Sequence, residues 1–157
     1  MEDHRLDLLS GKTLKELNAA EARGWVIERM NQIESNIDSK IADFVDPKDK
    51  HSFKKIILNS SIISTGGKLK ILAGLKLLDK KTMNDIRELS SIRNAFAHSV
   101  FVHATEIMID RKNNTTKGLA SYHNMEIMNS DGVLKSKKAH EHLERFYELN
   151  ERVGKAL

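Results

Sequence analysis

The hydrophobic residues of the first third of the chain follow a helical pattern. Apolar side chains recur every three or four positions, with mostly polar residues between them: Val26, Met30, Ile33, Ile37, Ile41 and Phe44. This spacing places them on one face of a helix. Residues 13–16 (Thr-Leu-Lys-Glu) have the form of a capping box ahead of it. The pattern stops at 45–47, where Asp46 is expected to cap a further helix and Pro47 to occupy its first position.

Four further helices are predicted from the same kind of pattern. They cover about 48–64, 68–78, 82–99 and 136–154, with Thr65-Gly66-Gly67 breaking the first of them and cap chemistry at 82–85 opening the third. The residues expected to face inward are Phe53, Ile56, Ile57, Leu58 and Ile63; Leu69, Ile71, Leu72, Leu75 and Leu78; Ile86, Leu89, Ile92 and Phe96; and Leu143, Phe146, Tyr147, Leu149 and Val153.

The pattern changes between 100 and 135. β-Branched and aromatic residues occur there without helical spacing, and two polar, turn-prone segments cover 111–118 and 129–132. We expect a β-hairpin or an irregular flap in this region. The predicted fold is therefore mainly α, an up-and-down helical bundle with one small insert near 100–135, and residues 1–157 are expected to form a single domain.

Composition narrows the function classes. The chain has 157 residues, one proline and no cysteine, which excludes disulfides, thiolate catalysis, zinc ribbons and iron–sulfur clusters. Lys and Arg exceed Asp and Glu by 26 to 22, a balance that permits contact with a polyanion without requiring it. No apolar run approaches the roughly 20 residues of a membrane span. The N-terminus does not have the pattern of a signal peptide. A soluble cytoplasmic protein without membrane contact is expected.

The segment 92–99 (Ile-Arg-Asn-Ala-Phe-Ala-His-Ser) contains the residues best suited to chemistry. Arg93 is a permanent cation that suits phosphate, and His98 can exchange protons near neutral pH. Asn94 and His98 are four residues apart, so on a helix the amide can orient the imidazole. Arg93 and His98 are separated by about 140° around an ideal helix. Either the helix distorts near His98, or a second copy supplies the partner group.

Arg93 also falls within the apolar arc of its helix, beside Ile86 and Leu89. A buried arginine requires a partner, because an unpaired buried charge is costly. A symmetric interface between two copies would supply one, and a homodimer is therefore expected.

These residues resemble a known superfamily. Arg93, Asn94 and His98 match the R-x4-6-H motif of the HEPN superfamily (higher eukaryotes and prokaryotes nucleotide-binding). Residues 62–102, with a helix containing Gly74-Leu75 ahead of Ile-Arg-Asn-Ala-Phe-Ala-His, are most similar to the mannitol operon repressor family. Outside that range the chain agrees only in being helical, and the insert at 104–128 departs from the pattern.

The resemblance implies a helical homodimer. Many HEPN proteins are metal-independent endoribonucleases of toxin–antitoxin or phage-defence systems. In that reading Arg93 holds the scissile phosphate, His98 transfers protons during attack by the 2′-hydroxyl, and Asn94 orients His98. Other members are non-catalytic, and the mannitol repressor branch is described as regulating transcription. Three functions therefore stay open. The chain is a nucleic-acid-associated regulator with nuclease activity, a non-catalytic regulator of RNA or DNA, or a dimeric scaffold for a protein such as an antitoxin. No helix-turn-helix is readable, which counts against direct major-groove reading.

Other candidate sites are less specific. Lysine and arginine side chains that could follow a nucleic-acid backbone are Lys68, Lys70, Arg111, Lys112 and Lys117. His140 and His142 are only two residues apart, a spacing that makes them diverge on a helix. No metal site and no cofactor are expected, and Gly66-Gly67 lacks the completion of a P-loop.

Overall fold

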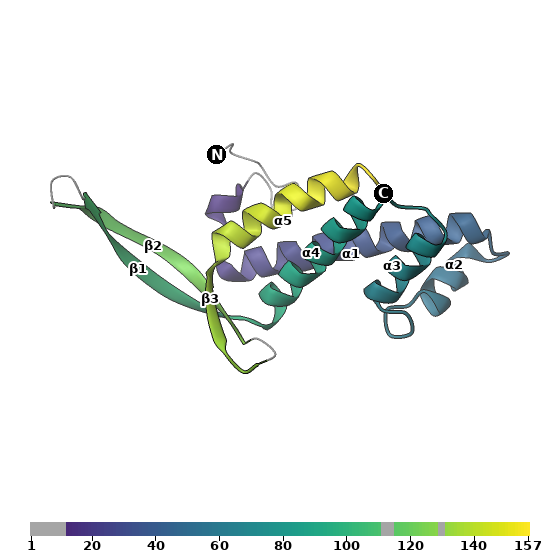
Figure 1. The fold of residues 1–157 in the computed structure, drawn as a ribbon, viewed down its shortest axis with the longest axis horizontal. Helices are drawn as coiled ribbons and strands as arrows, with labels where there is room; N and C mark the ends of the chain where they lie inside the picture. Colours follow the sequence, from purple (N-terminus) through teal and green to yellow (C-terminus); the bar gives the residue numbers. More distant parts are fainter. Residues whose placement is uncertain (1–11, 111–114, 129–130) are drawn as a thin grey trace. The chain divides into compact units, whose positions relative to one another are not determined.

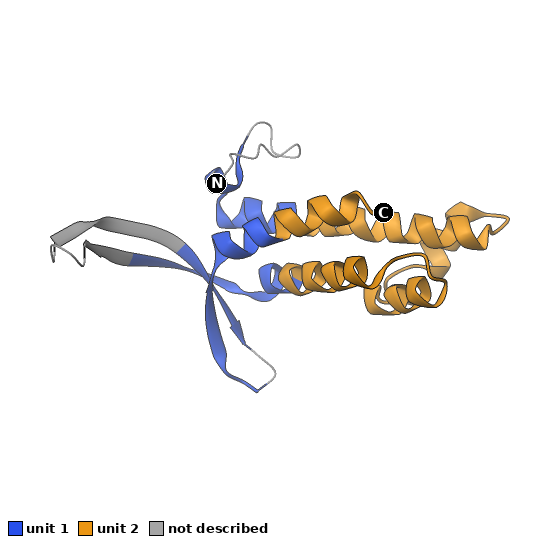
Figure 2. Cartoon of the chain, turned by 45° about the horizontal axis from the view of Figure 1, so that its top comes forward, with its two compact units in different colours: residues 1–26, 94–145 blue, residues 27–93, 146–157 orange. Residues whose placement is uncertain are grey.

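The computed structural model describes residues 12–110, 115–128 and 131–157, with backbone only for Lys15, 106–110 and 115–122. The described chain is mainly helical with one small sheet, as the sequence predicts (Figure 1). It divides into two compact units, one of residues 1–26 and 94–145 and the other of residues 27–93 and 146–157 (Figure 2). Helices α1 (Ala19–Val45), α4 (Lys80–His98) and α5 (Ala139–Gly154) each contribute residues to both units.

Helix α1 confirms the predicted apolar face, with one exception. Met30, Ile33, Ile37 and Ile41 are buried, but Phe44 is 55% exposed. The helix ends one residue after Phe44, because Asp46 adopts the left-handed conformation with a φ of 46°. Burial of the predicted face therefore ends before the helix does.

The start of α1 differs from the prediction. In the expected capping box, the Glu16 carboxylate accepts from the Thr13 backbone N–H at 2.7 Å. That box closes only the 3₁₀ turn η2 (Leu14–Glu16). A second reciprocal pair begins α1: Asn18 Oδ1 accepts from the Glu21 N–H at 2.9 Å, and Glu21 Oε2 accepts from the Asn18 N–H at 3.1 Å.

The helix predicted for 48–64 is wrong in extent. The structure has a single turn, α2 (Lys50–Ser52), capped by Asp49 in place of Asp46, and then a short π-helical segment, η3 (Phe53–Ile57). Leu58 is buried, but Ile56 and Ile57, expected to face inward, are exposed. Their outward positions explain why apolar content alone overestimated this helix.

The glycine pair predicted to break a helix lies inside one. Helix α3 spans Thr65–Gly74, and its N-cap Ser64 accepts from the Gly67 N–H at 3.3 Å. A Cβ at position 67 would lie 3.0 Å from Ile63 Cγ2, so the tight approach of the preceding chain favours glycine there. Leu69 and Leu72 are buried as expected.

Helix α4 begins two residues earlier than predicted. Asp79 is its cap: one carboxylate oxygen accepts from the Thr82 N–H at 2.9 Å and the other from the Thr82 hydroxyl at 2.7 Å. Thr82 therefore supports the cap instead of providing it. The predicted inward residues Ile86, Leu89, Ile92 and Phe96 are all buried.

Replacing the cap residue Asp79 with alanine should lower the thermal midpoint at pH 7 by a few degrees. The two hydrogen bonds from Thr82 lower the pKa of Asp79 below its ordinary value. Stabilisation by this carboxylate is then present above the ordinary aspartate pKa and is lost as the pH falls through the lowered pKa. Thermal melts from pH 7 to strongly acidic pH should show the difference between wild type and Asp79→Ala closing. Lys81→Ala, an exposed change in the same turn, should have no such effect.

The insert forms a three-stranded antiparallel sheet in the order β1-β2-β3. Strand β1 (Val100–Asp110) pairs with β2 (Thr115–Met128), which confirms the predicted hairpin, and β2 pairs with β3 (Leu134–Lys138). Strand β3 was not predicted, because its Leu-Lys-Ser-Lys-Lys sequence was assigned partly to the last helix. Helix α5 accordingly begins at Ala139, and its apolar face (Leu143, Phe146, Leu149 and Val153) is buried as predicted.

Candidate functional site

Two residues of the predicted motif, Asn94 and His98, are exposed. Asn94 and His98 lie on α4, and His98 is the last residue of that helix. The α-helix is continuous through His98, and the Ser99 N–H still donates to the Ala95 carbonyl at 2.9 Å. The helix therefore does not distort to bring Arg93 and His98 onto one face, and their directions stay about 140° apart.

Arg23 fixes the end of α4, a role that the sequence analysis missed. Its Nε donates to the Phe96 carbonyl at 2.8 Å and its Nη2 to the Ser99 carbonyl at 3.0 Å. The same guanidinium lies 5.1 Å from the centre of the Phe101 ring. The last carbonyls of a helix have no partner within the helix, so Arg23 satisfies them and holds the turn that carries His98.

Arg93 has a carboxylate partner within its own compact unit. Its side chain is 33% exposed, and its Nη2 lies 3.9 Å from Glu34 Oε1. The same Glu34 oxygen accepts a 2.6 Å hydrogen bond from the Thr65 hydroxyl. Since 3.9 Å is beyond hydrogen-bond range, the Arg93 guanidinium keeps donors for another anion. Glu34 was not singled out from sequence, because on its own it is one of many acids on the polar side of α1.

Lys68 and Asp38 form a buried ion pair in the same unit. Lys68 is only 2% exposed, and its Nζ lies 2.6 Å from Asp38 Oδ1. Burial raises the pKa of Asp38, and the hydrogen bond from Lys68 opposes that rise. Lys68 was expected on a nucleic-acid-binding surface. The structure buries this residue and turns its charge inward onto a carboxylate, so Lys68 does not lie on an exposed surface.

The other predicted nucleic-acid contacts have different outcomes. Lys70 is exposed on α3, where it stays available to a ligand. Arg111 and Lys112 lie outside the described residues. Lys117 lies in β2, where the structure gives the backbone alone.

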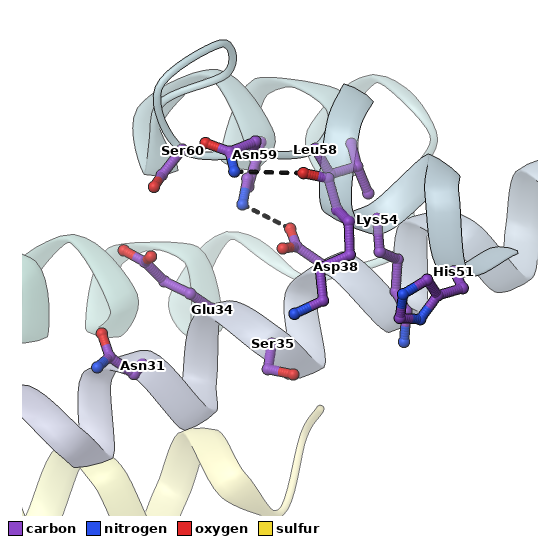
Figure 3. A pocket seen from close by; sticks show the side chains of 11 residues that line it. Asn31, Glu34, Ser35, Asp38, His51, Lys54, Leu58, Asn59 and Ser60 are labelled. Carbon is purple, nitrogen blue, oxygen red and sulfur yellow. Dashed lines mark hydrogen bonds and ion pairs between the residues drawn. The ribbon is translucent and has the colours of Figure 1, made fainter.

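A polar pocket of about 330 Å³ lies between α1 and the α2–α3 region (Figure 3). Its charged and titratable lining residues are Glu34, Asp38, His51, Lys54, Lys55 and Lys68. Figure 3 shows Glu34 and Asp38 on α1 pointing toward the segment that carries Asn59 and Ser60, with Lys54 beside His51. This pocket could not be predicted from the sequence, because its walls come from separate segments that share no motif.

Two histidines of the sheet contact each other. His103 and His123 face each other across β1 and β2 with ring centres 5.4 Å apart in an edge-to-face contact. Within the described ranges, His, Asp and Glu do not form a cluster of three suited to a metal ion.

No protein-family model, curated protein or solved structure matches the chain. None of the helices in the described part of the chain has the length and apolar character needed to cross a bilayer.

Proposed function

We propose that this chain is a HEPN-like endoribonuclease that acts without a metal ion and builds its active site from two copies. The proposal is carried by the exposure of the two motif residues. His98 is exposed at the end of an undistorted α4, and Arg93 is partly exposed with unused hydrogen-bond donors. On one helix these groups diverge, so a shared phosphate would have to lie between Arg93 of one copy and His98 of the other.

The chemistry of such a site needs only these protein groups and RNA. Arg93 offsets the charge of the scissile phosphate, and the His98 imidazole accepts the proton of the 2′-hydroxyl. The 2′-oxygen attacks phosphorus, the bond from phosphorus to the 5′-oxygen breaks, and that oxygen takes a proton from water or a second acid. The products are a 2′,3′-cyclic phosphate and a 5′-hydroxyl. Asn94, four residues before His98, orients the imidazole.

The test is the cleavage of a structured RNA by the purified protein in EDTA. We expect fragments that carry 2′,3′-cyclic phosphate ends, and no cleavage of the same molecule with 2′-deoxy sugars. Cleavage that requires an added divalent cation, or that proceeds on the deoxy strand, would exclude this mechanism.

A second candidate function is a dimeric scaffold or non-catalytic regulator, favoured by exposed apolar side chains on one face of the sheet. Val100 and Val102 on β1, Met128 on β2 and Leu134 on β3 are all exposed. The strand register puts Met128 opposite Leu134, and alternation along β1 puts Val100 and Val102 on one face. Contiguous exposed apolar groups mark interaction surfaces in many proteins. A protein that is dimeric by sedimentation and inactive on every RNA tested would favour this alternative.

A further inference from the structure

The pocket beside α1 has the features of a built binding site. Its volume of about 330 Å³ lies within the usual range for small-molecule sites. It is lined by a charged side chain that is almost fully buried, since Lys68 is 2% exposed. An ammonium group has three donors, and Asp38 occupies one of those on Lys68.

A gain in folding stability does not explain the buried Lys68–Asp38 ion pair well. Taking two charges out of water costs free energy that their attraction rarely exceeds, so apolar residues of similar size would serve folding as well. A pair that lines a cavity and keeps unused hydrogen-bonding capacity is better explained by something that binds there.

Each carboxylate of the pocket already lies beside a positively charged side chain, but some of the lysines of the pocket have no carboxylate partner among the described residues. Asp38 pairs with Lys68, and Glu34 lies next to Arg93 and accepts from Thr65. Lys54 donates to the Ser39 hydroxyl at 3.3 Å. Neither Lys54 nor Lys55 forms an ion pair with a carboxylate of the described residues. His51 lines the pocket next to them. The excess of positive charge favours an anionic ligand, and a dianion over a monoanion.

The α1 wall supplies acceptors for hydroxyl groups. Glu34 Oε1 is engaged by Thr65, and Asp38 Oδ1 by Lys68, so each carboxylate keeps its second oxygen for a ligand. Asn31 and Ser35 add further polar groups along the same helix (Figure 3).

We infer that this pocket binds a small phosphomonoester that carries hydroxyl groups, with the phosphate held by Lys54, Lys55 and Lys68 and the hydroxyls by Glu34 and Asp38. The inference does not depend on the proposed nuclease activity, because the pocket contains neither Asn94 nor His98. A ligand here would lie next to Glu34, the residue that contacts Arg93, which gives the pocket a route to influence Arg93.

Isothermal titration calorimetry at low salt tests the inference with four probes: glucose 6-phosphate, inorganic phosphate, glucuronate and glucose. Glucose 6-phosphate should bind most tightly and inorganic phosphate more weakly, because it lacks the hydroxyls. Glucuronate should bind more weakly than glucose 6-phosphate, and glucose should not bind at millimolar concentration. Absence of binding by both phosphate-bearing probes, or tighter binding of glucuronate, would overturn the inference.

Variants locate the site. Lys54→Ala and Lys55→Ala should each weaken the binding of glucose 6-phosphate about tenfold, the usual effect of losing one charge-assisted contact. Neither side chain is buried, so both variants should fold. Lys70→Ala, an exposed lysine of α3 outside the pocket, is the matched control and should leave the affinity unchanged. Equal weakening by all three variants would show only a general charge effect and would overturn the assignment. The assignment would also be overturned if Lys54 and Lys55 were needed for the binding of a short RNA but not for the binding of glucose 6-phosphate.

Discussion

Asp38→Asn should lower the free energy of unfolding by about 3 kcal/mol, because it leaves the Lys68 ammonium buried without a counter-charge. The side chains of Lys68 and Asp38 are 2% and 17% exposed, and their charged atoms lie 2.6 Å apart. Chemical denaturation at pH 7 measures the effect. Asp43→Asn, which removes a carboxylate that pairs with Lys50 on the surface, is the matched control and should leave the midpoint unchanged.

The double variant Asp38→Leu with Lys68→Met should recover most of the stability lost by Asp38→Asn. Both charges are then absent, and apolar side chains of similar size fill the space. A double variant no more stable than Asp38→Asn would mean that packing around Asp38, and not the charge on Lys68, causes the loss.

His98→Ala and Arg93→Ala should each slow RNA cleavage by about 10²-fold or more. Loss of a general acid–base group typically costs about 10²–10⁴-fold in rate, and loss of a cation that offsets phosphate charge is of similar weight. Asn94→Ala should cost less, about tenfold, because the amide orients the ring without transferring a proton. Single-turnover kinetics in EDTA provide the measurement.

The control for these rates is His140→Ala, which removes an exposed histidine of α5. Its rate should equal that of wild type. Full activity in His98→Ala would show that the motif is structural, and a loss in His140→Ala as large as in His98→Ala would show that the assay does not report on one site.

The long amphipathic elements were predictable because burial repeats with the helical period. The residues predicted to face inward on α1, α4 and α5 are buried, except that Phe44 is exposed and Tyr147 is half-buried. The hairpin was also predictable, since a segment rich in β-branched residues between polar turns does not have the spacing of a helix.

Element ends were harder to predict, because they depend on hydrogen bonds between side chains and backbone at single residues. The pairs Asn18–Glu21 and Asp79–Thr82 start α1 and α4, whereas Thr13 and Thr82 were read as the cap positions. The segment 48–64 was predicted to be one helix, but Ile56 and Ile57 are exposed and provide no buried face on which such a helix could pack. Intrinsic pattern gives way to tertiary context in such short segments.

The candidate site was predictable only in part. The motif Arg93-Asn94-x-x-x-His98 is visible in one stretch of sequence, and the exposure of His98 agrees with a chemical role. Glu34, Arg23 and the Lys68–Asp38 pair come from segments far apart along the chain, and no spacing rule brings them to the motif or to each other. Lys68 shows the limit most clearly, because a lysine in a polar stretch is ordinarily on the surface.

Complementation between two inactive variants tests whether the active site is built from two copies. Arg93→Ala and His98→Ala proteins are mixed under conditions that allow subunits to exchange, and RNA cleavage is measured in EDTA. In a mixed dimer, one of the two shared sites keeps both an intact Arg93 and an intact His98. With half of the dimers mixed, we expect about a quarter of the wild-type rate. A mixture as inactive as either variant alone, with exchange verified by co-purification of two differently tagged variants, would contradict an active site built from two copies.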